Sequence, residues 1–137
     1  MHHTGVLTIE TSGRSLTEFT RDAASWIADG GVSQGLLSLF VRHTSASLLI
    51  QENAAPEVQD DLIAFFDRLA PEGSHYLHDS EGPDDMPAHL KSALTQTHLA
   101  IPVIDGRLAL GTWQGIYLFE HRRRPHRREV VLHLAGE

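Results

Sequence analysis

The sequence predicts a single α+β domain that spans residues 1–137. Three amphipathic stretches have helical periodicity, and about seven short apolar runs bounded by turn residues are typical of strands. These helices and strands do not alternate regularly, which argues against a doubly wound fold. With 41% hydrophobic residues, the chain is long enough to bury one core of its own.

The first helix is expected to begin at a capping box formed by Ser15 and Glu18. Two glycines, Gly30 and Gly31, end the run. Apolar residues recur between these two signals at the spacing of one helix face, at Phe19, Ala23, Trp26 and Ile27.

Two nearly continuous apolar runs follow, Leu36–Val41 and Leu48–Ile50, and they predict two buried strands. The polar segment Arg42–Ser47 joins them, so its side chains should lie at a strand end. A second helix is predicted to begin near Pro56, a residue suited to a first turn, and to end before Pro71. Its apolar face carries Val58, Leu62, Phe65, Phe66 and Leu69.

A third, shorter helix is predicted over Pro87–Gln96, with Asp85 as its cap. Asp105–Gly106 is a strong hairpin signal between two further strands. Pro102 indicates that the first of them lies at a sheet edge or a bulge. The predicted strands of the second half are Leu99–Ile104, Arg107–Leu110, Ile116–Glu120 and Glu129–Leu134.

The segment Tyr76–His89 carries two histidines and four acids, the densest chemistry in the chain. A lone histidine is more often a packed or surface residue than a ligand. His43, His78 and His89, however, all lie in loops or at element ends beside carboxylates, where three imidazoles could hold a metal and leave a position open to water or substrate. The acids Asp79, Glu81, Asp84 and Asp85 suit helix capping, magnesium binding through diphosphate, or orientation of a histidine.

A second unusual segment, Gly111–Gly115, places Trp113 and Gln114 between two glycines. Trp113 is either a core residue at a bulge or a wall on which a ring stacks. Glu52 and Asn53 either cap the second helix or present a carboxylate and an amide to a ligand. Glu120 and Arg122 add an acid and a cation on the outgoing strand.

The composition excludes several kinds of site. The chain has no cysteine, so disulfides, thiolate metal sites and cysteine nucleophiles are excluded. We expect a soluble cytoplasmic protein, since the sequence has neither a membrane-spanning run nor an export signal.

The net charge is −7, although five of the eleven cationic residues cluster within 122–128. That basic cluster is either a solvated turn or a grip for phosphate, RNA or an acidic subunit, and the acidic remainder argues against nucleic acid as a partner.

Taken together, these motifs resemble the YjbQ-like family, often labelled secondary thiamine-phosphate synthase. The resemblance covers nearly the whole chain from about Leu7 to Glu137. It is carried by five segments in the family's order: His43–Ala46, Gln51–Ala54, Glu81–Lys91, Asp105–Tyr117 and Glu120–Arg122.

The resemblance implies a compact YjbQ-like α+β fold with a β-sandwich-like mixed sheet, assembled as a homotrimer. It also strengthens the prediction, made above from the residues, of a site for a divalent metal, zinc or magnesium, and for a small phosphorylated or anionic ligand. From the residues and the resemblance together we predict His43, His78 and His89 as metal ligands, Glu52, Asp85, His89 and Glu120 as catalytic groups, and Asn53, Lys91, Trp113, Gln114 and Arg122 as substrate-binding groups.

Three functions remain open at this point. The resemblance favours a low-level thiamine-phosphate synthase activity, in which a pyrimidine diphosphate is joined to a thiazole phosphate. A metal-dependent hydrolase would use a metal-activated water, with Glu52 or Asp85 as general base. A non-catalytic trimeric protein that binds a small anion would have the pocket without turnover.

Overall fold

The computed structural model describes residues 1–73 and 75–137. Its elements are β1 (His2–Thr11), β2 (Ser15–Glu18), α1 (Thr20–Gly30), β3 (Gly35–Val41), β4 (Ala46–Glu52), α2 (Pro56–Leu69), α3 (Asp85–Leu94), β5 (His98–Ile104), β6 (Arg107–Leu108), β7 (Gln114–Glu120) and β8 (His126–Gly136). No helix of the described residues combines the length and the apolar content that a membrane crossing requires.

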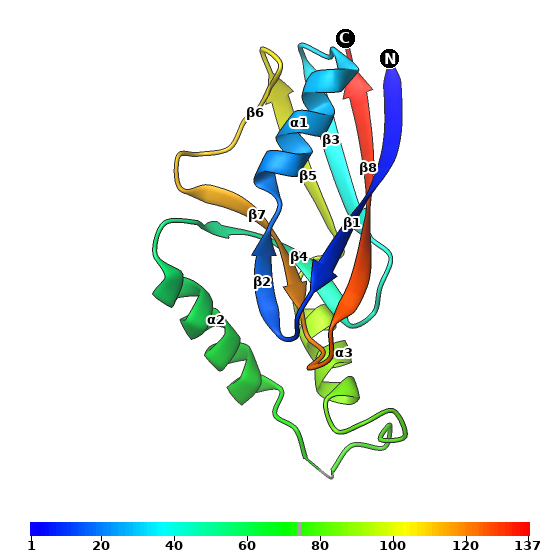
Figure 1. Cartoon of the computed structure of the whole chain (residues 1–137), viewed down its shortest axis with the longest axis vertical. Helices are drawn as coiled ribbons and strands as arrows, with labels where there is room; N and C mark the ends of the chain where they lie inside the picture. Colours follow the sequence, from blue (N-terminus) through cyan, green and yellow to red (C-terminus); the bar gives the residue numbers. More distant parts are fainter. Residues whose placement is uncertain (74) are drawn as a thin grey trace.

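The strands form two curled sheets, one with the order β1-β8-β3-β5-β6 and one with the order β2-β7-β4. Every strand pair in the described residues is antiparallel, so the expected mixed sheet is wrong in this respect. Helix α1 lies beside the upper part of the larger sheet, α2 lies against the smaller one, and α3 lies in the lower half of the molecule (Figure 1).

The core lies between the two sheets and α1. Leu37 and Leu39 of β3 are fully buried and pack with Leu132 of β8 and Leu118 of β7. The apolar run Leu36–Val41 is nevertheless only half buried, because side chains alternate between the two faces of a strand. Leu36 and Phe40 are 43% and 50% exposed on the outer face, which corrects the prediction of a strand buried on both sides.

A second cluster lies between the smaller sheet and α2. The Phe66 ring of α2 packs edge-on against Phe119 of β7, with centroids 5.4 Å apart. Helix α2 begins at Pro56, as predicted, and ends at Leu69. This cluster fixes α2 to one face of β7 while the other face of β7 contributes to the main core.

The start of α1 differs from the prediction. Residues Ser15–Glu18 form β2 and pair with β7, and α1 begins at Thr20 without a side-chain cap. Thr20 Oγ1 donates to Glu18 Oε2 (2.8 Å) and accepts from the backbone N–H of Ile116 (2.8 Å). Pairing with a neighbouring strand therefore replaces the local capping box.

The predicted hairpin at Asp105–Gly106 is present, although β6 is only two residues long. Both turn residues have positive φ, 52° at Asp105 and 76° at Gly106, as a type I′ turn requires. The Pro102 carbonyl accepts from Ala109 N–H on the β6 side. Since the nitrogen of a strand residue points to the same edge as its carbonyl, Pro102 takes no donor away from the ladder with β3.

Candidate metal centre

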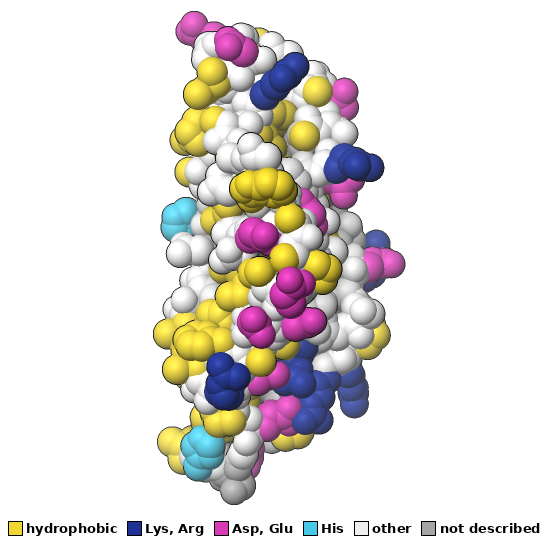
Figure 2. Space-filling model, turned by 90° about the vertical axis from the view of Figure 1, so that its left-hand side faces the viewer, with side chains coloured by type: hydrophobic (Ala, Val, Ile, Leu, Met, Phe, Trp, Pro, Cys, Tyr) yellow, Lys and Arg dark blue, Asp and Glu magenta, His cyan; other side chains and the backbone are white. Residues whose placement is uncertain are grey.

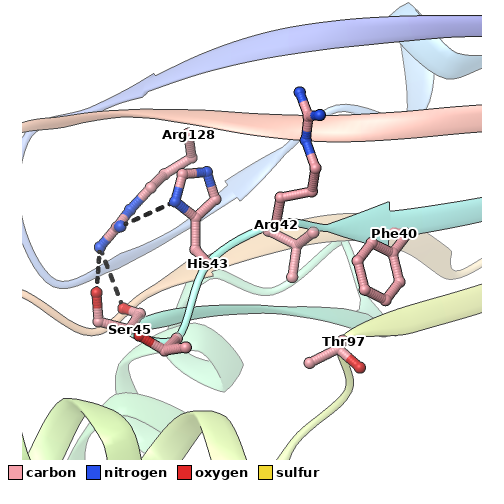
Figure 3. Close-up of a pocket in the computed structure, with 8 residues that line it drawn as sticks. Phe40, Arg42, His43, Ser45, Thr97 and Arg128 are labelled. Atoms are coloured by element: carbon pink, nitrogen blue, oxygen red, sulfur yellow. Dashed lines mark hydrogen bonds between the residues drawn. The ribbon is translucent and has the colours of Figure 1, made fainter.

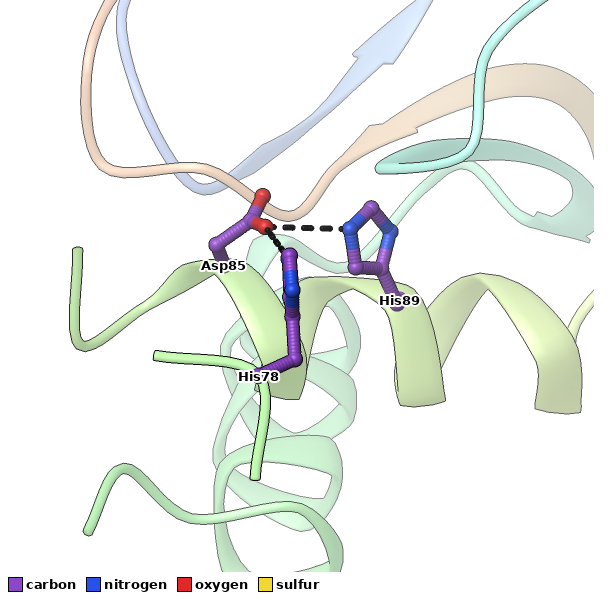
Figure 4. A group of neighbouring side chains, drawn as sticks. All are labelled: His78, Asp85 and His89. Atoms are coloured by element: carbon purple, nitrogen blue, oxygen red, sulfur yellow. Dashed lines mark hydrogen bonds and ion pairs between the residues drawn. The ribbon is translucent and has the colours of Figure 1, made fainter. Parts of the chain in front are cut away.

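Helix α3 and the loop before it bring two histidines and one aspartate together. Asp85 is the first residue of α3, and His89 lies one turn later on the same helix face. His78 reaches them from the loop (Figure 4). Asp85 Oδ2 lies 2.7 Å from His78 Nε2 and 3.0 Å from His89 Nε2, and the three ligand atoms all lie within 4.8 Å of one another. The three groups lie close enough together to share one cation after a small outward shift.

The predicted cap is shifted by one residue. Asp84, not Asp85, stands at the N-cap position, and its side chain does not cap the helix. Instead, Asp84 Oδ2 accepts from Arg122 Nε and from the backbone N–H of Arg123, both at 3.0 Å. The start of α3 is thus tied to the turn between β7 and β8.

Two of the three side chains are oriented by further hydrogen bonds. Arg122 Nη1 donates to Asp85 Oδ1 (2.7 Å), so Oδ2 remains directed at the histidines. His89 Nδ1 lies 2.9 Å from the carbonyl oxygen of Thr44, to which a ring N–H can donate. Metal-ligating histidines typically donate their other ring N–H to a carbonyl or carboxylate in this way.

The Asp85 carboxyl is 2% exposed, and its pKa is lowered. Burial alone would raise the pKa, but the hydrogen bond from His78 and the positive charges near it, including Arg122, outweigh that effect. Asp85 is therefore ionised at neutral pH. An ionised carboxylate is the form that binds a cation.

When the His89 ring is neutral, its Nε2 and Asp85 Oδ2 lack a hydrogen-bond donor between them. Its Nδ1–H is committed to Thr44, so Nε2 carries a lone pair when the ring is neutral. Asp85 Oδ2, at 3.0 Å, is also an acceptor. Two acceptors face each other favourably only when a proton or a metal cation lies between them.

The third predicted imidazole, His43, lies outside this group of ligand atoms, although it lines a hollow together with His89, so the three-histidine ligand set is not assembled in the structure. His43 Nε2 accepts from the backbone N–H of Glu129 (2.8 Å), and Nδ1 lies 3.4 Å from Arg128 Nη1. Burial, and then the charge of Arg128, lower the pKa of His43, so its ring is neutral. The structure assembles two imidazoles and one carboxylate in place of three imidazoles.

Glu120, predicted as catalytic, is fully buried in an ion pair. Arg128 Nε donates to its Oε1 (2.8 Å), Thr11 Oγ1 donates to the same oxygen (2.7 Å), and the backbone N–H of Arg122 donates to Oε2. Burial would raise the pKa of Glu120, but these hydrogen bonds and the charge of Arg128 lower it. With no exposed surface, Glu120 cannot touch a substrate in this conformation.

Four predicted residues lie at the opposite end of β7 from Glu120. Gln114 begins that strand and Glu120 ends it, so the two ends are ~20 Å apart. The Glu52 carboxylate accepts from the backbone N–H groups of Ala54 and Ala55, just before α2, as one of its two predicted roles requires. The residues at this end are Glu52, Asn53, Trp113 and Gln114.

The predicted phosphate-binding cations are engaged with acids of the chain. Lys91 is 4% exposed and donates to Asp67 Oδ1 (2.6 Å). Arg122 is held by Asp84 and Asp85. Neither side chain projects freely into solvent, so Arg122 orients the candidate ligand Asp85 instead.

The arginine-rich turn is largely neutralised by nearby acids. Arg123 pairs with Glu72, and Arg127 Nε lies 3.6 Å from Glu10. Figure 2 shows basic side chains lying among acidic ones near the lower end of the face in view. The turn therefore braces the loop and α3.

Sequence reasoning missed a buried polar chain beside the site. His121 Nε2 lies 2.9 Å from Ser47 Oγ, which lies 2.6 Å from Thr95 Oγ1. No motif marks this chain, because its members come from β4, the end of α3 and the residue after β7. The density of histidines and acids over Tyr76–His89 was the sequence signal that pointed to the metal centre.

The chain is similar along nearly its whole length to proteins of one family. A family model described as UPF0047 protein YjbQ-like matches residues 5–137. UPF0047 protein sll1880 of Synechocystis sp. is 55% identical over 98% of this chain and 92% of its own. UPF0047 protein YjbQ of Escherichia coli O157:H7 is 43% identical over 100% of both chains. The crystal structure of hypothetical protein APE1520 from Aeropyrum pernix K1 superposes with a TM-score of 0.90 at 32% identity, over 98% of this chain and 99% of that one.

Proposed function

This chain belongs to the UPF0047, YjbQ-like family, and from the geometry of its site we propose that it binds a divalent cation through His78, Asp85 and His89 and uses it on a small phosphorylated ligand. The observation that carries the proposal is the convergence of Nε2, Nε2 and Oδ2 on one point. Hydrogen bonds with Arg122 and with the Thr44 carbonyl orient Asp85 and His89, respectively.

The donor set favours zinc over magnesium. Two imidazoles and one carboxylate suit zinc and similar transition metals, whereas magnesium prefers oxygen ligands. Zinc ligands in a tetrahedral arrangement lie ~3.4 Å apart, so a small outward shift of His78, whose side chain is 44% exposed, would open the site. Three protein ligands leave a further position for water or substrate.

Among the three functions, this geometry best supports metal-assisted hydrolysis of a phosphate ester. A bound zinc ion would lower the pKa of a water molecule and polarise a phosphoryl oxygen. Asp85 would serve as a ligand, and Glu52 lies toward the far end of β7, so neither fits the role of general base. The Glu81 carboxylate, 66% exposed and 3.7 Å from His78 Nε2, is placed to accept a proton from such a water.

Thiamine-phosphate synthase activity is the second candidate. The transfer would require magnesium on the diphosphate and free cations on the phosphates. Lys91 and Arg122 are both paired with acids, and Trp113 lies far from the cluster. For this reason we rank the transfer below hydrolysis, although the family label favours it.

The first test is elemental analysis of the untagged protein after exposure to zinc. We expect about one zinc per chain in the wild type. We expect at least ~100-fold weaker binding in His78→Ala, His89→Ala and Asp85→Asn, because each substitution removes or weakens one of three ligands. His98→Ala, which changes an exposed histidine on β5, should bind like the wild type. A wild type without zinc, or loss in none of the three variants, would overturn the site.

Turnover separates the candidate functions. Hydrolysis predicts zinc-dependent release of nitrophenol from 4-nitrophenyl phosphate, with a loss of rate in Glu81→Gln at unchanged zinc content. An anion-binding protein would show no turnover, and phosphate would raise its melting temperature equally well after chelation. Formation of thiamine phosphate that survives His89→Ala would exclude the cation site from that reaction.

We also propose a homotrimer, supported by an apolar strip on the outer face of the larger sheet. Leu36, Pro102 and Ala135 lie side by side on three neighbouring strands, and Ile104 beside them is 52% exposed. An apolar strip of this kind is typical of a contact between chains. Sedimentation should give three times the chain mass, and Leu36→Glu should lower it. A monomeric wild type would refute the assembly.

A further inference from the structure

Two adjoining hollows run from the candidate metal centre to the outer face of the larger sheet. The first, of about 460 Å³, has His89 and Ala93 in its lining, and the second, of about 490 Å³, has Phe40 and Arg42. His43, Thr44 and Thr97 line both, so the two hollows adjoin, and together they are called the depression below. Figure 3 shows Phe40 and Thr97 at one end of the second hollow and His43 and Arg128 at the other.

The lining of this depression is mostly uncharged. Arg128 is 5% exposed and bound to Glu120 and Ser45, and the neutral His43 accepts from a backbone N–H. The remaining lining near His89 consists of small side chains, among them Ala93 and the hydroxyl and methyl groups of two threonines. Such a surface suits an organic group better than a second phosphate.

The far end of the depression carries a ring and a cation that a ligand could use. Phe40 is 50% exposed, although its ring is large and apolar. Arg42 Nη2 pairs with Glu129 Oε1 at 2.9 Å, and both side chains are about half exposed. A surface ion pair of this kind is weak, so Arg42 can turn to a ligand at little cost.

We propose that this depression binds the organic part of a phosphate monoester, and that this part includes a planar ring packed against Phe40. The proposal rests on the cation site proposed above, which would hold the phosphate beside His89. It assigns to Phe40 the ring-binding role that the sequence suggested for Trp113. The substrate class is therefore an aromatic or heterocyclic phosphate.

The test compares phenyl phosphate with methyl phosphate as ligands of the zinc-loaded Glu81→Gln protein, in which the proposed hydrolysis is slowed, by titration calorimetry. The two probes share the phosphate and differ in the ring. Burial of a ring face against Phe40 should give phenyl phosphate ~10-fold tighter binding in this background. Addition of Phe40→Ala should abolish this preference and leave methyl phosphate binding and zinc content unchanged.

Two further variants test whether the preference for phenyl phosphate depends on the depression itself. Val6→Ala removes an apolar side chain from the same sheet face and the same cross-strand row as Phe40, outside both hollows, and should keep the preference. Ala93→Phe fills the first hollow and should weaken phenyl phosphate binding while methyl phosphate still binds.

The outcomes separate this proposal from the cation site. Stoichiometric zinc with equal affinity for the two probes, or a preference that survives both Phe40→Ala and Ala93→Phe, overturns the ring site and leaves the cation site standing. A protein without zinc whose preference for phenyl phosphate is still lost in Phe40→Ala supports the ring site and overturns the cation site.

Discussion

Replacement of Arg128 by methionine should destabilise the fold by about 3–5 kcal/mol, the usual cost of breaking a buried ion pair by removing one partner. Glu120 has no exposed surface, and Arg128 supplies two of its hydrogen bonds. The variant would leave a buried carboxylate with only the Thr11 hydroxyl and one backbone N–H as donors. The free energy of unfolding, measured in urea at pH 7, checks this expectation.

The matched control is Arg127→Met, on the same strand one residue earlier. Arg127 is 75% exposed and 3.6 Å from Glu10, so its loss should leave stability unchanged within error. The double variant Glu120→Gln, Arg128→Met removes the unpaired charge and should recover part of the loss. Strict additivity of the two substitutions, or a loss for Arg128→Met no greater than for Arg127→Met, would contradict the buried pair.

Acid should destabilise the protein through His121. Burial, and then the charges of Lys91 and Arg128, lower the pKa of His121 from 6.5 to about 3. Between these values the unfolded chain binds a proton that the folded chain does not. The stabilisation is therefore complete above about pH 6.5 and falls as pH decreases, by about 1.4 kcal/mol per pH unit, or roughly 2–3 kcal/mol between pH 6.5 and 4.5.

His121→Gln isolates this effect, because glutamine does not titrate and can still donate to Ser47. Unfolding in urea at pH 7, 6 and 5 should show a flatter pH dependence in the variant than in the wild type. His43, whose pKa is also lowered, contributes in the same direction, so the difference between the two proteins is the measured quantity. His98→Gln, on the exposed side of β5, should retain the wild-type slope. Equal slopes in all three would show that His121 takes up its proton in the folded state.

Local patterns predicted much of the fold. Helix α2 begins at Pro56, because proline fixes φ at a value suited to a first helical turn, and the Asp105–Gly106 turn joins β5 to β6, because glycine adopts positive φ without strain. The segment Ser15–Glu18 was misassigned, since a capping box is worth about 1 kcal/mol and a full strand pairing with β7 outweighs it. Which faces of β3 are buried was also beyond local reasoning, because both faces carry apolar residues.

The candidate site was predicted only in part, because local sequence patterns do not show which distant residues meet. His78, Asp85 and His89 all belong to the histidine-rich and acidic segment that the sequence singled out, and the start of α3 brings Asp85 and His89 onto one helix face. Trp113 and Glu120 belong to motifs only seven residues apart in the sequence, yet an extended strand carries them to opposite ends of the sheet. His43 has the composition of a ligand, but the fold directs it to the backbone of β8. A histidine-rich sequence shows which groups are present, and the topology decides which of them meet.

The position of β8 also has a consequence for how the chain folds. It is the last strand in the sequence, yet it lies between β1 and β3 and pairs with both. On a ribosome, β1 would have no edge to pair with in this sheet until β8 had emerged, so the earlier strands would wait with apolar surface exposed. Long-range pairing of this kind is typical of slow folding, in milliseconds to seconds.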